Sequence, residues 1–377
     1  MINCQRLTDE FFRLAAIDSP SYREGAIAGY LAQRFRQLGA SVAFDDAGDR
    51  IGSESGNMTA RLPGSRAGDP FLLCVHMDTV SPAQDVQPVL HDGIFSSAGH
   101  TILGADDKAG IAEIIEAIEV LKEQQIPHVP LEVVITVCEE QGLLGAKEFD
   151  YTTLTARHGV ALDTTGIDRV INRAPAANRF AIDITGLEAH AGVCPEEGIS
   201  AIGIAARAIA RMPLGRIDGE TTANIGTISG GIATNIIPGQ VSLRGEVRSQ
   251  NPARLREVTE TIVRCVEEEV HGASVELGGK ILRATMAIDL KEDFPAMQVP
   301  ETAAIVQLVL GAGKALQRPQ QVCAAGGGSD ASIFNGHGID MVILATGMER
   351  VHTVEEQVAV SDMEKVSALL VEIIRNA

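Results

Sequence analysis

The sequence has no tryptophan, few aromatic residues and no excess of positive charge. Aromatic side chains make up 3% of the 377 residues, so the core must be largely aliphatic. The formal net charge is −19, and no basic face of the kind that binds nucleic acid stands out. No apolar run approaches the ~18 residues of a membrane span. We therefore expect neither a nucleic-acid partner nor a membrane.

Six cysteines are scattered along the chain, and no two of them form a CxxC pair. Cys74, Cys138 and Cys265 lie within apolar stretches, which indicates buried thiols. Asp9 and Glu10 interrupt the first apolar residues, so this stretch lacks the uncharged segment of a secretory signal. A reducing cytoplasm is the location that these features predict.

The order of apolar segments predicts an α/β protein. Four apolar runs are typical of buried parallel strands, namely 71–75, 131–137, 159–162 and 341–345. Apolar residues at three- to four-residue spacing predict a helix over 109–122. Because the chain is longer than one core usually spans, we expect two domains. Residues 1–177 and 290–377 are predicted to form the larger one, around a mixed sheet.

The pattern changes in the middle of the chain. Six segments follow one another in the order β-α-β-β-α-β: 180–184, 198–212, 222–229, 240–248, 255–270 and 273–277. This order is that of the ferredoxin-like fold. We therefore expect residues 178–289 to form a smaller α+β domain inserted into the larger one.

Histidine and acidic residues collect where the predicted strands end. The set comprises His76, Asp78, Glu139, Glu140, Asp163 and His352, and Asp106 precedes the helix at 109–122. In open α/β sheets, ligands bind at the carboxyl ends of the strands. Imidazole and carboxylate ligands without thiolate suit zinc, cobalt or manganese. The sequence therefore predicts a site for two divalent ions, with the ligands His76, Asp106, Glu140, Asp163 and His352.

Each of these signals alone has a plainer explanation. The acidic pair at 106–107 could cap a helix, and a lone histidine such as His352 is often a surface residue. The order of these residues at successive element ends is what favours a metal site. Glu139 is a further carboxylate, next to the predicted ligand Glu140, and it is not needed to bind an ion. Hydrolysis at a two-metal site needs a carboxylate of this kind as general base and acid. Asp78 is placed to orient the imidazole of His76.

Longer segments resemble a known family, the zinc exopeptidases that include peptidase T, carboxypeptidase G and the succinyl-diaminopimelate desuccinylases. The similar segments are VHMDTV (75–80), LGADDKAGIAEI (103–114), TVCEEQGLLGA (136–146), ALDTTG (161–166), GLEAHAG (186–192), GGIATNIIPGQVSLRGEVRS (230–249), GGGSDASIFNGHGI (326–339) and GMERVHT (347–353). GADDKAG followed by EEQGLLGA favours the peptidase T-like branch. The resemblance covers essentially the whole chain.

The resemblance implies a role for each ligand. His76 and Asp163 would bind one ion, Glu140 and His352 would bind the other, and Asp106 would bridge them. Glu139 would act as general base and acid.

The resemblance also implies roles around the insertion, which would serve as a lid and dimerisation domain. His190 would reach the active site of the partner in a homodimer and stabilise the oxyanion. Asn235 and Arg248 would contact substrate or the oxyanion. The glycine-rich segment 326–330 lacks the spacing of a phosphate-binding loop, so we expect Gly327 and Ser329 to line the substrate cleft. A turn histidine at 190 and a surface charge at 248 remain the plainer alternatives.

These observations predict a di-metal exopeptidase, most simply a zinc enzyme, that hydrolyses the amide bond of short peptides. A tripeptide-type aminopeptidase is the expected activity. The same machinery serves a carboxypeptidase or an N-acyl-amino-acid deacylase, and the pocket around 190–250 and 320–335 decides between them. An alternative of another class is a protein that binds metal or peptide without turnover, but such a protein needs no spare base like Glu139.

Overall fold

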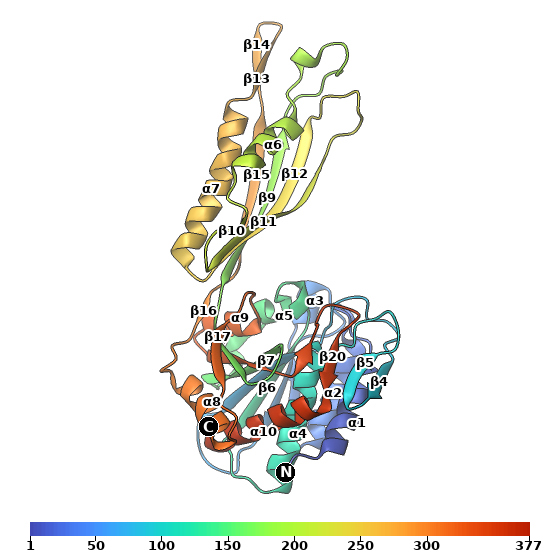
Figure 1. Cartoon of the computed structure of the whole chain (residues 1–377), viewed down its shortest axis with the longest axis vertical. Coiled ribbons are helices and arrows are strands. Elements are labelled where there is room, and N and C mark those ends of the chain that lie inside the picture. The colour runs from blue at the N-terminus through green and yellow to red at the C-terminus, as the bar shows by residue number, and fades with distance from the viewer. The chain divides into compact units, whose positions relative to one another are not determined.

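The protein is described by a computed structural model that covers residues 1–377. The chain forms two compact units, Met1–Ala174 with Met297–Ala377, and Pro175–Ala296 (Figure 1). The expected boundaries at 178 and 289 fall inside two paired strands, β9 (Ala176–Thr185) and β15 (Thr285–Phe294). Because Ala177 pairs with Phe294, both strands lie entirely within the inserted unit. None of the helices combines the length and apolar character that a membrane span needs.

The larger unit is built on a nine-stranded mixed sheet, with the order β1-β2-β6-β3-β7-β18-β8-β16 and with β17 beside β8. In chain order these strands are β1 (Ser41–Phe44), β2 (Met58–Leu62), β3 (Phe71–His76), β6 (Leu131–Thr136), β7 (His158–Thr164), β8 (Arg169–Ala174), β16 (Met297–Gln298), β17 (Gln321–Ala324) and β18 (Asp340–Ala345). β3 runs parallel to β6 and β7, and β7 runs parallel to β18. The four predicted parallel strands are therefore confirmed. Every residue of β3 and β6 is buried, as expected for a sheet covered on both faces.

Helices and a small second sheet complete this unit (Figure 1). The helices are α1 (Cys4–Ala15), α2 (Gly25–Gln37), α3 (Ala47–Ile51), α4 (Ala105–Glu123), α5 (Leu144–Glu148), α8 (Ala304–Ala315), α9 (Asp330–Gly336) and α10 (Val360–Asn376). The second sheet has the order β19-β20-β5-β4, formed by β4 (Pro88–His91), β5 (Ile94–Ser97), β19 (Met348–Glu349) and β20 (Gln357–Ala359). α4 packs against α1, α10 and β3, and most of its residues are buried, charged ones such as Lys108 and Glu113 included.

The inserted unit has a five-stranded antiparallel sheet in the order β10-β11-β12-β9-β15. Its remaining elements are α6 (Ala201–Arg211), β10 (Gly215–Arg216), β11 (Thr221–Gly230), β12 (Gln240–Ser249), α7 (Pro252–His271), β13 (Ser274–Leu277) and β14 (Lys280–Arg283). Both helices pack on the sheet through β9 and β12 (Figure 1). Their contact buries aliphatic side chains such as Ile182, Leu243 and Ile262.

The β-α-β-β-α-β order of the insertion is present, but its last strand was predicted wrongly. Residues 274–277 pair with β14 in a separate hairpin, and β15 closes the main sheet. Most side chains of β15 are exposed, with Met286 and Ile288 packed against the core, so its apolar signal is weak. The clearer alternation of polar and apolar residues at 274–277 belongs to the separate two-stranded hairpin of β13 and β14.

Candidate active site

The predicted metal ligands lie together at one edge of the larger unit's sheet. His76 ends β3, Asp163 lies near the end of β7, and Glu140 is in a short 3₁₀ turn that follows β6. Asp106 is in the first turn of α4, and His352 follows β19. Parallel strands bring their carboxyl ends to the same edge, which explains how residues so far apart in sequence meet.

The distances divide these side chains into two sets that share Asp106. Oδ1 of Asp106 lies 3.0 Å from Nε2 of His76, which is 3.9 Å from Oδ1 of Asp163. Oδ2 of Asp106 lies 3.3 Å from Nε2 of His352, which is 2.9 Å from Oε1 of Glu140. His76, Asp106 and Glu140 each offer one atom that could bind a metal ion, and these three atoms lie within 4.8 Å of one another.

A cavity of about 350 Å³ opens onto this cluster. Its wall includes Asp106, Glu139, Glu140, Asp163 and His352, together with the glycine-rich segment 324–329. Gly327 and Ser329, predicted as substrate contacts, therefore lie in the same cavity as the predicted ligands. Glu139 is buried at its edge, with 9% of its surface exposed.

The cluster concentrates negative charge in a buried place, and this shifts the pKa of several groups. Burial and the nearby Asp106 carboxylate raise the pKa of Asp163 to about 7. Hydrogen bonds to Asp106 and Glu140 raise the pKa of His352 to about 10. Burial, and then the charge of Asp163, raise the pKa of Glu139 well above its ordinary value. Crowded carboxylates with two imidazoles are a donor set that divalent cations fit, because cations relieve the repulsion.

Asp78 is fully buried and holds the turn that carries Glu139 and Glu140. Its Oδ1 accepts a hydrogen bond from the N–H of Glu139 at 2.9 Å, and its Oδ2 accepts from the N–H of Glu140 at 3.2 Å and from the hydroxyl of Ser21 at 2.7 Å. The ring of His76 donates from Nδ1 to the backbone carbonyl of Asp78 at 2.9 Å. Nε2 of His76 is thereby left to face Asp106, as a metal ligand requires.

The sequence analysis missed Glu356. This side chain is 2% exposed and accepts backbone hydrogen bonds from the loop that precedes Asp106 and from Asp106 itself. The only signal in the sequence is its position four residues after His352, which by itself is weak.

The remaining predicted residues lie in the inserted unit. His190 is exposed, and the N–H of the next residue, Ala191, donates to the carbonyl of Asn235 at 2.9 Å, so the His190 and Asn235 segments are adjacent. Arg248 is near the other end of β12, where it pairs with Glu246 at 2.9 Å and lies 5.9 Å above the ring of Phe294. The structure thus groups His190 with Asn235 and separates both from Arg248.

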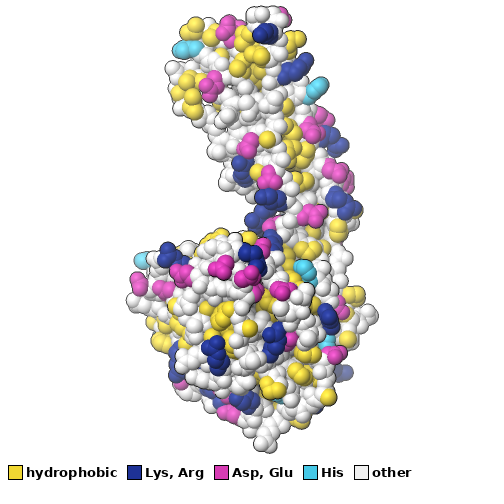
Figure 2. Space-filling model, turned by 180° about the vertical axis from the view of Figure 1, so that it is seen from behind, with side chains coloured by type: hydrophobic (Ala, Val, Ile, Leu, Met, Phe, Trp, Pro, Cys, Tyr) yellow, Lys and Arg dark blue, Asp and Glu magenta, His cyan; other side chains and the backbone are white.

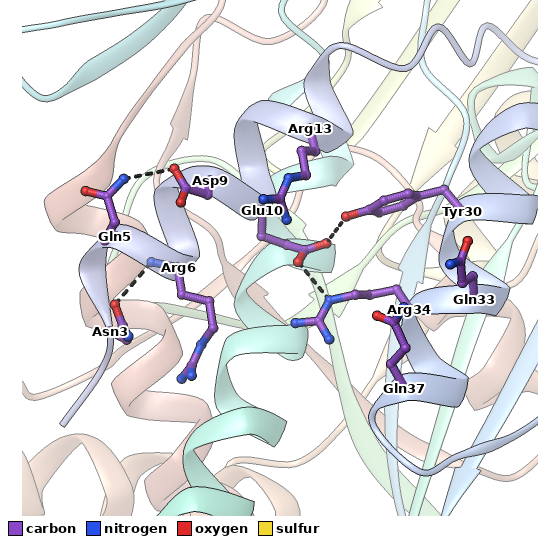
Figure 3. A pocket seen from close by; sticks show the side chains of 10 residues that line it. All are labelled: Asn3, Gln5, Arg6, Asp9, Glu10, Arg13, Tyr30, Gln33, Arg34 and Gln37. Carbon is purple, nitrogen blue, oxygen red and sulfur yellow. Dashed lines mark hydrogen bonds and ion pairs between the residues drawn. The ribbon is translucent and has the colours of Figure 1, made fainter.

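A larger cavity, of about 590 Å³, lies between α1 and α2 (Figure 3). Several of its side chains contact one another: Glu10 accepts from the hydroxyl of Tyr30 at 2.6 Å and from Nε of Arg34 at 2.8 Å (Figure 3). Arg6 pairs with Glu116 at 2.6 Å. These contacts tie α1 to α2 and α4, and the cavity gathers no histidine. We therefore assign it a structural role and take the smaller cavity as the active site.

Comparison with known proteins identifies the class. Residues 72–376 match Peptidase family M20/M25/M40, so the chain belongs to this family. It is 42% identical over 378 residues to the uncharacterized protein YqjE of Bacillus subtilis (strain 168), and the alignment covers 100% of both chains. The predicted resemblance to the family is confirmed, and the chain is a hydrolytic enzyme, a peptidase. The alternative of a protein without turnover is set aside.

Two solved structures are similar over nearly the whole chain. The aminopeptidase PepT of Bacillus cereus ATCC 10987 has 40% sequence identity and a TM-score of 0.91, over 99% of this chain and 98% of that one. The tripeptidase SAV1512 of Staphylococcus aureus subsp. aureus Mu50 has 37% identity and a TM-score of 0.94, over 100% of this chain and 99% of that one. These similarities agree with the predicted peptidase T-like branch.

Proposed function

We propose that this peptidase is a di-metal aminopeptidase that removes the first residue of short peptides, tripeptides above all. The observation that carries the proposal is Asp106, whose two carboxylate oxygens face two different histidines. Similarity to an aminopeptidase and to a tripeptidase supports the substrate class.

The donor atoms suggest how two ions would be held. His76 and Asp163 would bind one ion, His352 and Glu140 would bind the other, and Asp106 would bind both. Imidazole and carboxylate donors without thiolate fit zinc, with cobalt and manganese as substitutes. Two such ions, when bound, lower the pKa of water and polarise the carbonyl of the substrate.

Glu139 is the proposed general base and acid. It takes a proton from the attacking water, whose oxygen bonds to the amide carbon, and it gives this proton to the nitrogen as the C–N bond breaks. Burial raises the pKa of Glu139 above the ordinary value of a carboxyl group, which is the direction that favours a group that must both take up and release a proton. Asp78 keeps the Glu139 main chain in place. Gly327 and Ser329 are proposed to line the substrate cleft.

We further propose a homodimer through the inserted unit, with His190 and Asn235 contributing to the partner's active site. Several apolar side chains of this unit are exposed, among them Val193 (75%), Ile232 (72%) and Ile228 (56%). Figure 2 shows hydrophobic side chains on one face of the unit. The outer edge of β11 pairs with β10 only at Thr222 and Ala223, which leaves a free edge along Asn224–Gly230. Exposed apolar patches and free strand edges are typical of interfaces.

Arg248 and the cellular location complete the proposal. Arg248 remains a proposed substrate contact, held by Glu246. All six cysteines are free, which supports the reducing cytoplasm predicted from the sequence.

The test is a matched set of substrates: a free tripeptide, the same peptide N-acetylated, the same peptide as its C-terminal amide, and an N-acyl amino acid. The enzyme is stripped with a chelator and then reloaded with zinc, cobalt or manganese. We expect metal-dependent release of the first residue from the free tripeptide and no cleavage of the N-acetylated form. Cleavage confined to the N-acetylated peptide and the N-acyl amino acid would instead indicate a carboxypeptidase or a deacylase.

A further inference from the structure

The loop that carries Asp106 is held by a carboxylate from a distant part of the chain. Oε2 of Glu356 accepts hydrogen bonds from the N–H of Leu103 at 2.8 Å and of Gly104 at 2.7 Å. Oε1 accepts from the N–H of Asp106 itself at 3.0 Å. Hydrogen bonds to a carboxylate are roughly twice as strong as those between neutral groups. Both oxygens of Glu356 are thus directed at this one loop.

This loop needs an external acceptor. Gly104 has a φ of +77°, and Asp106 has a φ of −82° and a ψ of 103°, so neither has helical geometry although α4 is beginning there. The first N–H groups of a helix have no partner within the helix. The carboxylate of Glu356 takes the place of that partner, and it fixes the main chain from which the Asp106 side chain projects.

Glu356 also belongs to the segment that carries His352. The two residues are four apart, and the N–H of Glu356 donates to the carbonyl of Thr353 at 3.1 Å, which closes a turn between them. β20 begins at the next residue and pairs with β5, so the far end of the segment is anchored as well. A single buried side chain therefore connects the loop of Asp106 to the loop of His352.

The neighbouring Glu355 shows what an ordinary acidic residue does in this segment. Its side chain is 71% exposed, and it pairs with Arg350 at 3.3 Å. It makes no contact with the Asp106 loop in the structure. The two adjacent glutamates thus offer a matched pair, one buried against the site and one in solvent.

We propose that Glu356 is a positioning residue of the two-ion site, which sets the Asp106 carboxylate between His76 and His352 and so controls how tightly the ions bind. This inference rests on the proposed function. It assigns Glu356 no contact with the substrate or with the ions.

The test compares Glu356→Gln with Glu355→Gln in the full-length protein. A glutamine at 356 keeps one acceptor oxygen and turns an NH₂ group toward N–H donors, so the loop loses part of its anchor. We expect Glu356→Gln to bind zinc roughly 10- to 100-fold more weakly, as is typical when a residue that supports metal ligands is changed. Its cobalt-loaded form should also show a changed visible absorption spectrum, whereas Glu355→Gln should match the wild type in both measurements. Wild-type affinity and spectrum in Glu356→Gln would overturn the inference.

Thermal unfolding separates positioning from a purely structural role. If Glu356 positions the site, added zinc stabilises Glu356→Gln less than it stabilises the wild type, because ligand-induced stabilisation follows affinity. An equal loss of stability in the ion-free and loaded forms would show a structural role only. Should Glu356→Gln not fold, Glu356→Asp keeps the charge on a shorter side chain and is expected to weaken zinc binding in the same direction. A wild type that binds no ions would contradict the proposed function instead, so the two failures are distinguishable.

Discussion

The carboxylate of Asp106 lies between two histidines that come from opposite ends of the sequence. Its Oδ1 is 3.0 Å from Nε2 of His76, and its Oδ2 is 3.3 Å from Nε2 of His352. Each histidine also faces a carboxylate of its own, Asp163 or Glu140. This arrangement is what a bridging ligand between two ions requires.

Replacing Asp106 with asparagine keeps the size of the side chain and removes the charge that two ions would share. We expect fewer than two ions per chain by elemental analysis. We also expect kcat/KM to fall more than about 100-fold, because a catalytic metal supplies several kcal/mol of transition-state stabilisation. Asp92→Asn is the control, since the side chain of Asp92 is 87% exposed and outside the site. Two tightly bound ions in Asp106→Asn would exclude the bridging role.

Asp78→Asn should weaken the turn that presents Glu139. The asparagine can accept at one oxygen only, so it cannot serve the N–H groups of both Glu139 and Glu140 as Asp78 does. We expect kcat to fall by roughly 10- to 100-fold. Ser21→Ala removes one further hydrogen bond to Asp78 and leaves the turn contacts intact, so its effect should be smaller. Equal effects of the two substitutions would argue against the anchoring role.

Tyr30→Phe tests the assignment of the larger cavity to a structural role. Loss of the 2.6 Å hydrogen bond to Glu10 should lower the free energy of unfolding by about 1 kcal/mol at pH 7 and leave kcat/KM unchanged. Burial and Glu10 raise the pKa of Tyr30 to about 12, above its ordinary value near 10. A raised pKa favours folding below pH 10, and this stabilisation is lost as the pH rises through about 12.

The difference in unfolding free energy between wild type and Tyr30→Phe should therefore shrink between pH 10 and about 12, which denaturant titrations at several pH values would measure. A loss of activity in Tyr30→Phe without loss of stability would point to a functional role for this cavity.

The proposed dimer predicts complementation between two inactive variants. Glu139→Gln lacks the base, and His190→Ala lacks the histidine that is proposed to act across the interface. A heterodimer of the two, obtained by co-expression with different tags, has one site with an intact Glu139 and the partner's intact His190. We expect it to regain activity that neither variant shows alone. A heterodimer that forms but stays inactive would place His190 outside the partner's site.

The sequence was sufficient to predict four adjacent strands of the nine-stranded sheet and to propose candidate site residues near their ends. The strands that end at His76, Thr136 and Thr164 are rich in apolar residues, and a parallel sheet places their polar ends at one edge. Such patterns are local and strong. The limits of the inserted unit were less visible, because β15 is mostly exposed and carries little apolar signal.

The supporting contacts of the site could not be predicted, because they join residues far apart in sequence through backbone groups. The Glu356 carboxylate binds N–H groups of Leu103, Gly104 and Asp106, about 250 residues away. Asp78 was expected to orient His76, and its Oδ1 lies 3.5 Å from Nδ1 of His76 while its carbonyl accepts from the same nitrogen at 2.9 Å. Its carboxylate also holds the turn at 139–140, which was not foreseen. A backbone N–H has no sequence signature, so only the fold reveals such partners.

The most direct test of the central claim is a paired measurement of bound metal and tripeptide hydrolysis in Glu139→Gln and Glu140→Gln. The account predicts that Glu139→Gln keeps two ions per chain and loses kcat by about 10²- to 10⁴-fold, the range that a general base contributes. It predicts that Glu140→Gln loses an ion as well as activity. Hydrolysis at the wild-type rate by Glu139→Gln, or two firmly bound ions in Glu140→Gln, would contradict the proposed site.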